Sequence, residues 1–288
     1  MANEASSTLG ALTDLAGEWH GAGLCVSYLP THAKVSITSD IFLIKEIAET
    51  IPNRGNAFGS SDTDIEFKGL DYTHTIHDNA GTHDLLHYET GQLLNIISPT
   101  PIPDTNINDK VKPYLVQLAL NPNGYALNTW IPVPVESINK IDIPPVRKKL
   151  IDLPLTPGDF KAIFGTLPAG ITEEDLNNPN QWLAKKTEEI HTNSEDYHST
   201  SIQFASDSSH EQNPDHDFKT TGNTGQISTL KAEKENPASI KNIDTSFWIE
   251  KYKEGTSNTT QLQYSQQVVY TIDGKDYTQI SVATLKKM

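Results

Sequence analysis

Alternation of apolar and polar positions dominates the chain, and it is clearest between residues 67 and 97. From 70 to 77 the sequence LDYTHTIH places Leu, Tyr, His and Ile on one side of an extended chain and polar residues on the other. Turn-forming residues follow at 78–82, and a second apolar run extends from Leu85 with a break at Gly91. A period of two residues interrupted by Asn and Gly is typical of paired strands. This segment therefore predicts an antiparallel meander that would form one wall of any chemical site.

The same alternation recurs on both sides of a long middle segment. Further strands are predicted at 24–29, 36–48, 114–120, 125–130, 246–252, 261–272 and 277–285. The turn sequences NPNG at 121–124 and DG at 273–274 join neighbouring strands as hairpins. Strands that pair with their sequence neighbours form up-and-down barrels. We therefore predict a mainly all-β fold, an antiparallel up-and-down calycin-like β-barrel of about ten strands with a helical and loop insertion.

Residues 131–240 interrupt the alternation, and we predict that they form this insertion within a single domain spanning 1–288. Prolines concentrate in 131–157, which suits a linker or an edge strand because proline has no amide proton to donate to a sheet. A polar loop rich in Asp, Ser, Asn and His is predicted at 207–224. Residues 131–157 are therefore expected to form a linker or an edge strand, outside the central strands of the barrel.

Helix signals within the insertion lie at 159–164 and 172–191. Thr172 precedes three acidic residues, which is the pattern of a capped first turn stabilised by negative charge. Asn180 is placed to cap a second helix at 181–191. These helices are followed by a predicted strand at 197–204.

Charge and cysteine content exclude several classes of protein. The chain carries 37 Asp and Glu against 22 Lys and Arg, a net charge of −15, which disfavours binding to nucleic acid or to anionic membrane surfaces. Cys25 is the single cysteine, so neither a disulfide framework nor a thiolate metal cluster is expected. The sequence has no signal-peptide pattern and no apolar run long enough to span a membrane as a helix. We therefore expect an acidic, cytoplasmic protein.

Several segments, in their order along the chain, resemble a known family. GEWHGAG at 17–23 is similar to the GxWxGxG opening of nitrobindin-like, fatty-acid-binding-protein-like barrels. The other segments, which resemble a bacterial and fungal branch described as haem-binding β-barrels, are IPNRG at 51–55, GLDY at 69–72, LHYETGQLLN at 86–95, FWIE at 247–250, LQYSQ at 262–266 and ISVATL at 280–285. The resemblance covers both halves of the barrel and omits the insertion. It implies a barrel that binds haem or another apolar small molecule in its interior.

The chain departs from this family at one position that matters for haem. A histidine normally stands directly before the last strand, and in nitrobindins it ligates the iron, whereas this chain has Gln279 there. A carboxamide oxygen is a much weaker ligand for haem iron than an imidazole nitrogen. Haem would then have to bind through His87, His74 or a tyrosine such as Tyr277, and His87 is the candidate iron ligand. Otherwise the barrel holds a different apolar molecule and no cofactor.

His87 and Glu89 are the candidate catalytic residues. They share one face of a predicted strand, where the carboxylate can orient the imidazole and make it more basic. The alternative is a structural histidine whose hydrogen bonds are satisfied inside the barrel. Tyr72 and His74 share a face of the preceding strand, so both are candidate ligand-binding residues.

The remaining candidate ligand-binding residues come from three other segments. Gly21 and Gly23 stand beside Trp19, and small residues at a strand start let the backbone approach a flat ligand closely. The alternative is that Trp19 plugs the end of the barrel core. Arg54 lies in a predicted turn, either as a ligand anchor or as a surface charge, and Gln279 completes the set.

Three functions remain open from the sequence. The first is binding of haem or another apolar small molecule in the barrel. The second is a barrel enzyme that acts on an apolar molecule with His87 and Glu89 as acid and base, or a haem-dependent peroxidase-like enzyme; standard nucleophile, zinc-protease, P-loop and dinucleotide motifs are missing. The third is a protein whose helical segment at 159–191 docks a partner. A homo-oligomer is compatible with all three.

Overall fold

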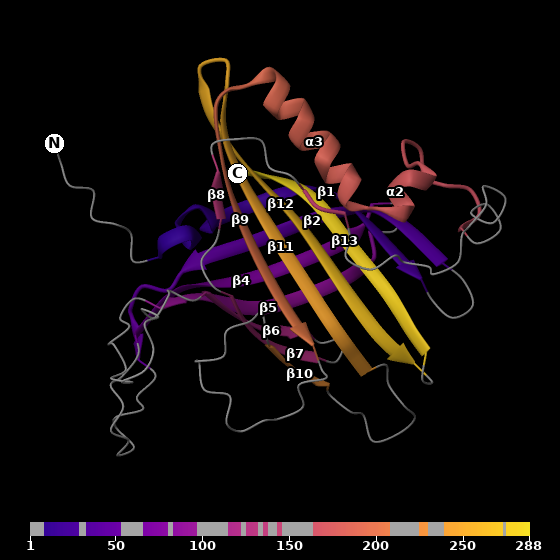
Figure 1. Ribbon diagram of the computed structural model, residues 1–288, viewed down its shortest axis with the longest axis horizontal. Helices are drawn as coiled ribbons and strands as arrows, with labels where there is room; N and C mark the ends of the chain where they lie inside the picture. Colours follow the sequence, from indigo (N-terminus) through magenta and orange to yellow (C-terminus); the bar gives the residue numbers. More distant parts are fainter. Residues whose placement is uncertain are drawn as a thin grey trace, which may run out of the picture.

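The fold is described from a computed structural model for residues 9–28, 33–52, 66–79, 83–96, 115–121, 125–131, 135–137, 143–145, 164–207, 225–229, 239–272 and 275–288. One antiparallel sheet of thirteen strands dominates it and curls on itself (Figure 1). The strands are β1 (Gly17–Tyr28), β2 (Ala33–Glu46), β3 (Ile51–Pro52), β4 (Glu66–Asp78), β5 (Leu85–Ile96), β6 (Leu115–Asn121), β7 (Tyr125–Ile131), β8 (Val135–Ser137), β9 (Glu195–Asp207), β10 (Gly225–Thr229), β11 (Ser239–Glu254), β12 (Ser257–Ile272) and β13 (Lys275–Lys287). The helices are the 3-10 helix η1 (Gly10–Leu15), α2 (Glu173–Asn177) and α3 (Asn180–Asn193).

The sheet consists of two meanders that are joined edge to edge by the pairing of β1 with β13. Its strand order is β10-β7-β6-β5-β4-β2-β1-β13-β12-β11-β9-β8, with β3 paired to β4. Both β7 and β10 lie against β9, so the outer ends of the two meanders approach each other. Most strands pair with a sequence neighbour, which confirms the predicted mainly β, up-and-down calycin-like architecture.

The number of strands is larger than the predicted ten because the sheet includes short pieces. β3, β8 and β10 are two, three and five residues long, while each of the other strands has seven residues or more. Two of these short strands, together with the long β9, come from the segment predicted as an insertion. That segment therefore supplies part of the wall itself, in addition to two helices: the strand predicted at 197–204 lies within β9, and β8 is at the end of the strand order, as predicted for an edge strand.

The pairing of β4 with β5 shows how the alternation of the sequence places polar side chains inside. Tyr72 lies opposite Gly91, and His74 lies opposite Glu89. The register shifts after Ile76, where β5 begins. Gly91 is needed here because a Cβ atom would come within 2.7 Å of the Tyr72 ring and 2.2 Å of a backbone oxygen. The predicted meander is therefore confirmed, and the break at Gly91 makes room for a neighbouring aromatic side chain.

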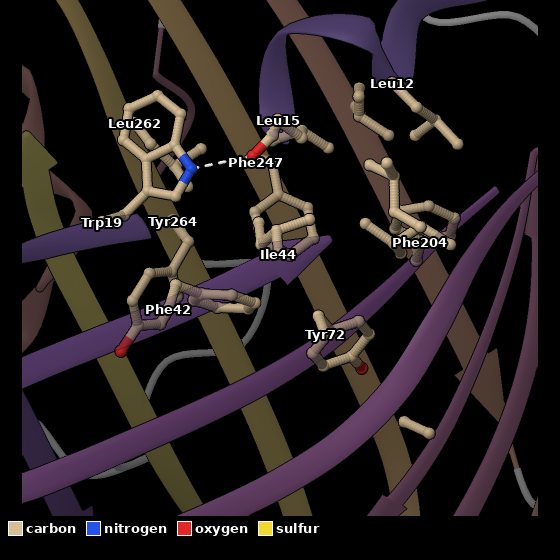
Figure 2. Packing of buried hydrophobic residues seen from close by; sticks show 14 of the residues in the cluster. Leu12, Leu15, Trp19, Phe42, Ile44, Tyr72, Phe204, Phe247, Leu262 and Tyr264 are labelled. Carbon is tan, nitrogen blue, oxygen red and sulfur yellow. Dashed lines mark hydrogen bonds between the residues drawn. The ribbon is translucent and has the colours of Figure 1, made fainter. Parts of the chain in front are cut away.

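The main apolar core fills the concave side of the sheet. Its members come from η1 and from nearly every long strand, and the largest of them are Trp19, Phe42, Phe204, Phe247 and Tyr264. Figure 2 shows Leu12 and Leu15 of η1 next to these side chains, and the Trp19 indole donates a hydrogen bond to the Leu15 carbonyl at 2.8 Å. Burying side chains of this size contributes about 1.5–3 kcal/mol each to stability.

A second apolar cluster lies on the convex side, where the helices cover the sheet. Leu176 of α2 and Leu183 of α3 pack with Trp248, Ile280 and residues of β1. Figure 1 shows α3 lying across the C-terminal strands, and its contacts with β13 agree with this view. The helical segment is therefore docked on its own sheet through an apolar face.

Of the two predicted helix caps, the Thr172 cap of α2 is confirmed and the Asn180 cap of α3 is not. Thr172 and Asp175 form a capping box, in which each side chain accepts a hydrogen bond from the backbone amide of the other residue. The Asn180 cap was wrong, because Pro179 is the N-cap of α3 and Asn180 lies inside the helix. The Asn180 amide instead donates to the Pro144 carbonyl at 2.7 Å and accepts from the Ser265 hydroxyl at 2.7 Å. Its polar groups thus fasten α3 to β12.

Among the described residues, no helix combines the length and the apolar character that crossing a membrane would require. The single-domain assignment for 1–288 and the cytoplasmic location stay predictions.

Candidate functional site

A cluster of polar side chains lies inside the curled sheet, among the aromatic residues of the main core. We call it the interior polar cluster; its members are Asp40 of β2, Tyr72 and His74 of β4, His87 and Glu89 of β5, Gln117 of β6 and Tyr264 of β12. Each side chain is buried, and none exceeds 7% relative exposure. Polar groups are costly to remove from water, so their hydrogen bonds decide whether this cluster is stable by itself.

One side of the cluster runs from Gln117 to His87. The Tyr72 hydroxyl donates to Glu89 Oε1 at 2.6 Å, and the Gln117 amide Nε2 donates to the Tyr72 oxygen at 3.1 Å. The other carboxylate oxygen of Glu89 lies 3.7 Å from His87 Nε2. Tyr72 therefore holds the carboxylate that faces the imidazole, and the predicted proximity of His87 and Glu89 is confirmed.

The other side of the cluster centres on Asp40. The Tyr264 hydroxyl donates a hydrogen bond to Asp40 Oδ2. His74 Nε2 lies 3.6 Å from the same oxygen, which is beyond hydrogen-bond distance. The rings of His74 and His87 meet edge to face with centroids 5.5 Å apart, so they connect the two sides.

Aromatic rings enclose His74. Phe42 stacks on it with a centroid distance of 4.1 Å, and Tyr264 meets it edge-on at 4.8 Å. Phe42 also contacts Tyr72 at 5.4 Å and Phe247 at 6.0 Å. The polar cluster is thus embedded in an aromatic environment of low polarity, where electrostatic interactions are strong and unpaired polar atoms are costly.

Burial changes the protonation of two members of the cluster. Burial lowers the pKa of His87 to about 4, and the opposing influence of the Glu89 carboxylate is smaller. His87 is therefore neutral at pH 7. Burial and the neighbouring Asp40 raise the pKa of Tyr264 well above its usual value, so its hydroxyl keeps its proton.

Three polar atoms of the cluster lack a hydrogen-bond partner among the described residues. They are Asp40 Oδ1, His74 Nε2 and Gln117 Oε1. An unsatisfied buried donor or acceptor costs about 1–3 kcal/mol, and few are retained in native proteins. A ligand or a buried water with matching hydrogen-bonding groups would satisfy these atoms.

Trp19, Gly21 and Gly23 pack against other parts of the same sheet. The Trp19 side chain is fully buried, and the Lys287 ammonium lies 5.3 Å from its ring centroid. A Cβ atom at Gly21 would come within 2.0 Å of the Thr284 carbonyl oxygen, and one at Gly23 within 2.5 Å of a carbonyl oxygen of β13. The small residues thus allow close approach of β13, which is the neighbouring strand.

Arg54 and Gln279 are the two other predicted ligand contacts. Arg54 falls outside the described residues. Gln279 of β13 is partly buried, and its amide donates to the sulfur of Cys25 at 3.5 Å. The Ser281 hydroxyl contacts the same sulfur at 3.5 Å, and burial raises the pKa of the Cys25 thiol.

Sequence reasoning grouped Tyr72 with His74 and His87 with Glu89, and it missed the other members. Asp40 lies on a strand that is apolar on both faces, so its orientation was ambiguous. Gln117 lies on a strand that alternates poorly. One feature could have indicated the orientation of Asp40: Asp40, Phe42 and Ile44 are spaced two residues apart, so they lie on the same face of β2. That face is continuous with the face of β4 that carries Tyr72 and His74.

The arrangement of the His, Cys, Asp and Glu side chains bears on metal and haem ligation. Among the parts of the chain that the structure describes, no group of three or more His, Cys, Asp or Glu side chains is arranged to hold a metal ion. His74 and His87 have the imidazole nitrogens that haem iron would need. Both rings are closely packed, however, and the Nε2 atom of each lies within 3.7 Å of a carboxylate oxygen. The described site therefore fits a smaller molecule better than a porphyrin.

Comparisons with known proteins give no family for this chain. No family model matches the chain, and no curated protein matches it. Among solved structures, the crystal structure of Rv2717c from M. tuberculosis aligns with 98% of this chain and 98% of its own, with a TM-score of 0.42 and 14% sequence identity. The fold assignment stands on the strand pairing of this chain, and the resemblance to nitrobindin-like barrels stays a prediction.

Proposed function

We propose that this protein binds a small, mainly apolar molecule inside the curled sheet, with one hydrogen-bonding end directed at the interior polar cluster. The observation that supports it is that polar atoms of Asp40, His74 and Gln117, within a buried aromatic environment, have no hydrogen-bond partner among the residues that the structure describes. Ligand sites are typically apolar with a few convergent polar groups. A molecule of this kind would satisfy the polar atoms and contact the surrounding rings.

The energetic reason is the cost of leaving the cluster incomplete. Three unsatisfied atoms at about 1–3 kcal/mol each amount to a substantial fraction of the 5–15 kcal/mol that stabilises a typical protein. Apolar side chains of similar size would avoid this cost at the same positions. Ligand binding explains why the polar side chains are present, because their open atoms gain hydrogen-bond partners when the ligand enters.

Haem is one candidate ligand within this proposal, and His87 or His74 would supply its axial nitrogen. When bound, haem would supply redox or ligand-binding chemistry at its iron. The close packing around both imidazoles favours a smaller ligand.

Catalysis by His87 and Glu89 is the weaker alternative. A general base works best when its pKa lies near the working pH. With a pKa of about 4, His87 is a poor proton acceptor at neutral pH and cannot serve there as an acid. Hydrogen bonding to a ligand makes no such demand, so binding accounts for the cluster more simply.

Native mass spectrometry of the purified protein, followed by titration with 1-octanol in a calorimeter, tests the proposal. We expect a copurifying small molecule or 1:1 binding of the alcohol. Haemin addition with visible absorption spectroscopy tests haem separately, since a shifted Soret band reports ligation. No bound species and no binding of octanol would overturn the proposal.

Octanol can also bind to exposed apolar side chains, so a control is needed. Leu85 and Leu120 are the most exposed large aliphatic residues of the described strands, at 57% and 51%. Leu85→Ser and Leu120→Ser remove these residues without changing the interior polar cluster. Unchanged octanol affinity in both variants would assign the binding to the interior, and its loss would assign it to the surface and contradict the proposal.

A further inference from the structure

We infer that the polar end of the ligand is a protonated amine, held by Asp40 and His74 beside the Phe42 and Tyr264 rings. This inference rests on the proposed function and specifies its ligand class. It follows from which hydrogen-bonding groups the interior polar cluster leaves open, since an open acceptor requires a donor from the ligand.

Asp40 presents an open acceptor. The Tyr264 hydroxyl donates to Asp40 Oδ2, whereas Oδ1 has no partner among the described residues. His74 Nε2 is also unpartnered and lies 3.6 Å from Oδ2. An ammonium group has several N–H donors, so it can donate to Asp40 and, when its Nε2 carries a lone pair, to His74 as well.

Gln117 presents a second open acceptor, and its orientation is fixed by its neighbour. The single hydroxyl proton of Tyr72 is donated to Glu89, so the Tyr72 oxygen must accept from Gln117. The Gln117 amide therefore turns its Nε2 toward Tyr72 and leaves Oε1 open. Both fixed open groups of the cluster are acceptors, which selects a ligand that donates hydrogen bonds.

The charge balance favours a cationic donor over a neutral one. The Asp40 carboxyl group is fully buried, and the nearby His87 is neutral at pH 7. Lys68 is the buried lysine of the described residues, and its ammonium is engaged by the carbonyl oxygens of Ile47 and Ala48. Among the described residues, no lysine or arginine forms an ion pair with Asp40.

The aromatic rings add a second attraction for a cation. Phe42 lies two residues from Asp40 on the same face of β2, and its ring contacts the rings of His74 and Tyr264. A cation near the face of an aromatic ring is attracted by the electrons of the ring, most strongly where water is excluded. A carboxylate and aromatic rings together are therefore suited to an ammonium group with an apolar tail.

Calorimetric titration of the full chain at pH 7.5 with octylamine, 1-octanol and octanoate tests this inference, because the three probes share one chain length. We expect octylamine to bind at least about tenfold more tightly than octanol, as a charge-assisted hydrogen bond is stronger than a neutral one, and octanoate to bind most weakly. Equal binding of octanol and octylamine would overturn the inference, in favour of a buried water at Asp40, while leaving the proposed function intact. If none of the three binds, the proposed function itself fails.

Two further measurements assign the preference to Asp40. Asp40→Asn should remove most of the octylamine advantage over octanol, whereas Asp71→Asn, at an exposed position on the outer face of β4, should leave this advantage and the octanol affinity unchanged. An unaltered preference in folded Asp40→Asn would overturn the inference. Should Asp40→Asn fail to fold, the wild-type protein is titrated with trimethyloctylammonium, which keeps the charge but has no N–H donor. Binding as tight as that of octylamine would then contradict hydrogen bonding to Asp40.

Discussion

Replacing Gln117 by leucine should make the ligand-free protein more stable, although it removes a buried hydrogen bond. The bond from Gln117 Nε2 to Tyr72 contributes about 1 kcal/mol, whereas the open Oε1 costs about 1–3 kcal/mol. Leucine has a similar size and no polar atom, so the net gain is expected to be about 1 kcal/mol. For a chain of 288 residues this corresponds to a rise in Tm of roughly 2 °C.

The same substitution at Gln263 provides the matched control. Gln263 is also fully buried, but its amide accepts from Thr187 at 3.0 Å and donates to the Leu183 carbonyl and to Thr284, each at 3.2 Å. Gln263→Leu should therefore lower stability by about 3 kcal/mol, since each lost hydrogen bond contributes about 1 kcal/mol. Urea unfolding followed by circular dichroism gives both values. A loss of more than about 1 kcal/mol in Gln117→Leu would refute the conclusion that Oε1 is unsatisfied.

Three other predictions concern the pH response, the strand contact and the helix cap. Burial lowers the pKa of His87 from 6.5 to about 4 in the folded protein, so the unfolded chain binds an extra proton between these pH values. The free energy of unfolding should therefore fall by about 3 kcal/mol as the pH drops from 6.5 to 4. His87→Gln should flatten this part of a plot of the urea midpoint against pH. Gly21→Ala should cost more than about 2 kcal/mol in thermal unfolding because of the Thr284 oxygen; a neutral result would mean that β13 shifts freely. Thr172→Ala should lower stability by about 1 kcal/mol in the same assay, whereas Thr192→Ala, at an exposed position, should leave it almost unchanged. Equal effects of the two substitutions would mean that the capping box does not stabilise the protein.

The alternation of the sequence was sufficient to predict the fold class and part of the site. A period of two residues fixes which side chains share a face, so Tyr72 and His74 on one strand and His87 and Glu89 on the next could be grouped without coordinates. The same local pattern could not identify Tyr264, because it reaches Asp40 across a sequence separation of 224 residues. Contacts of this kind depend on how the sheet curls.

The middle of the chain was predicted less well, for a different physical reason. The prolines of 131–157 and the polar residues of 207–224 concealed the short strands β8 and β10, which lie within or next to these ranges. A strand was predicted at 197–204, within β9, but β8 and β10 are too short to give a pattern. The cap of α3 was misplaced because Asn180 bonds to Ser265 of β12, which is a tertiary contact that overrides the local preference.

The pairing of β1 with β13 has a consequence for how the chain acquires its structure. Cys25 and Ser281 touch across a sequence separation of 256 residues, so the first long strand leaves the ribosome well before its partner exists. During synthesis one edge of β1 has no strand to pair with, and unpaired edges promote aggregation. Pairings between such distant segments also fold slowly. This protein should therefore depend on chaperones, or on slow translation, more than a helical protein of equal length does.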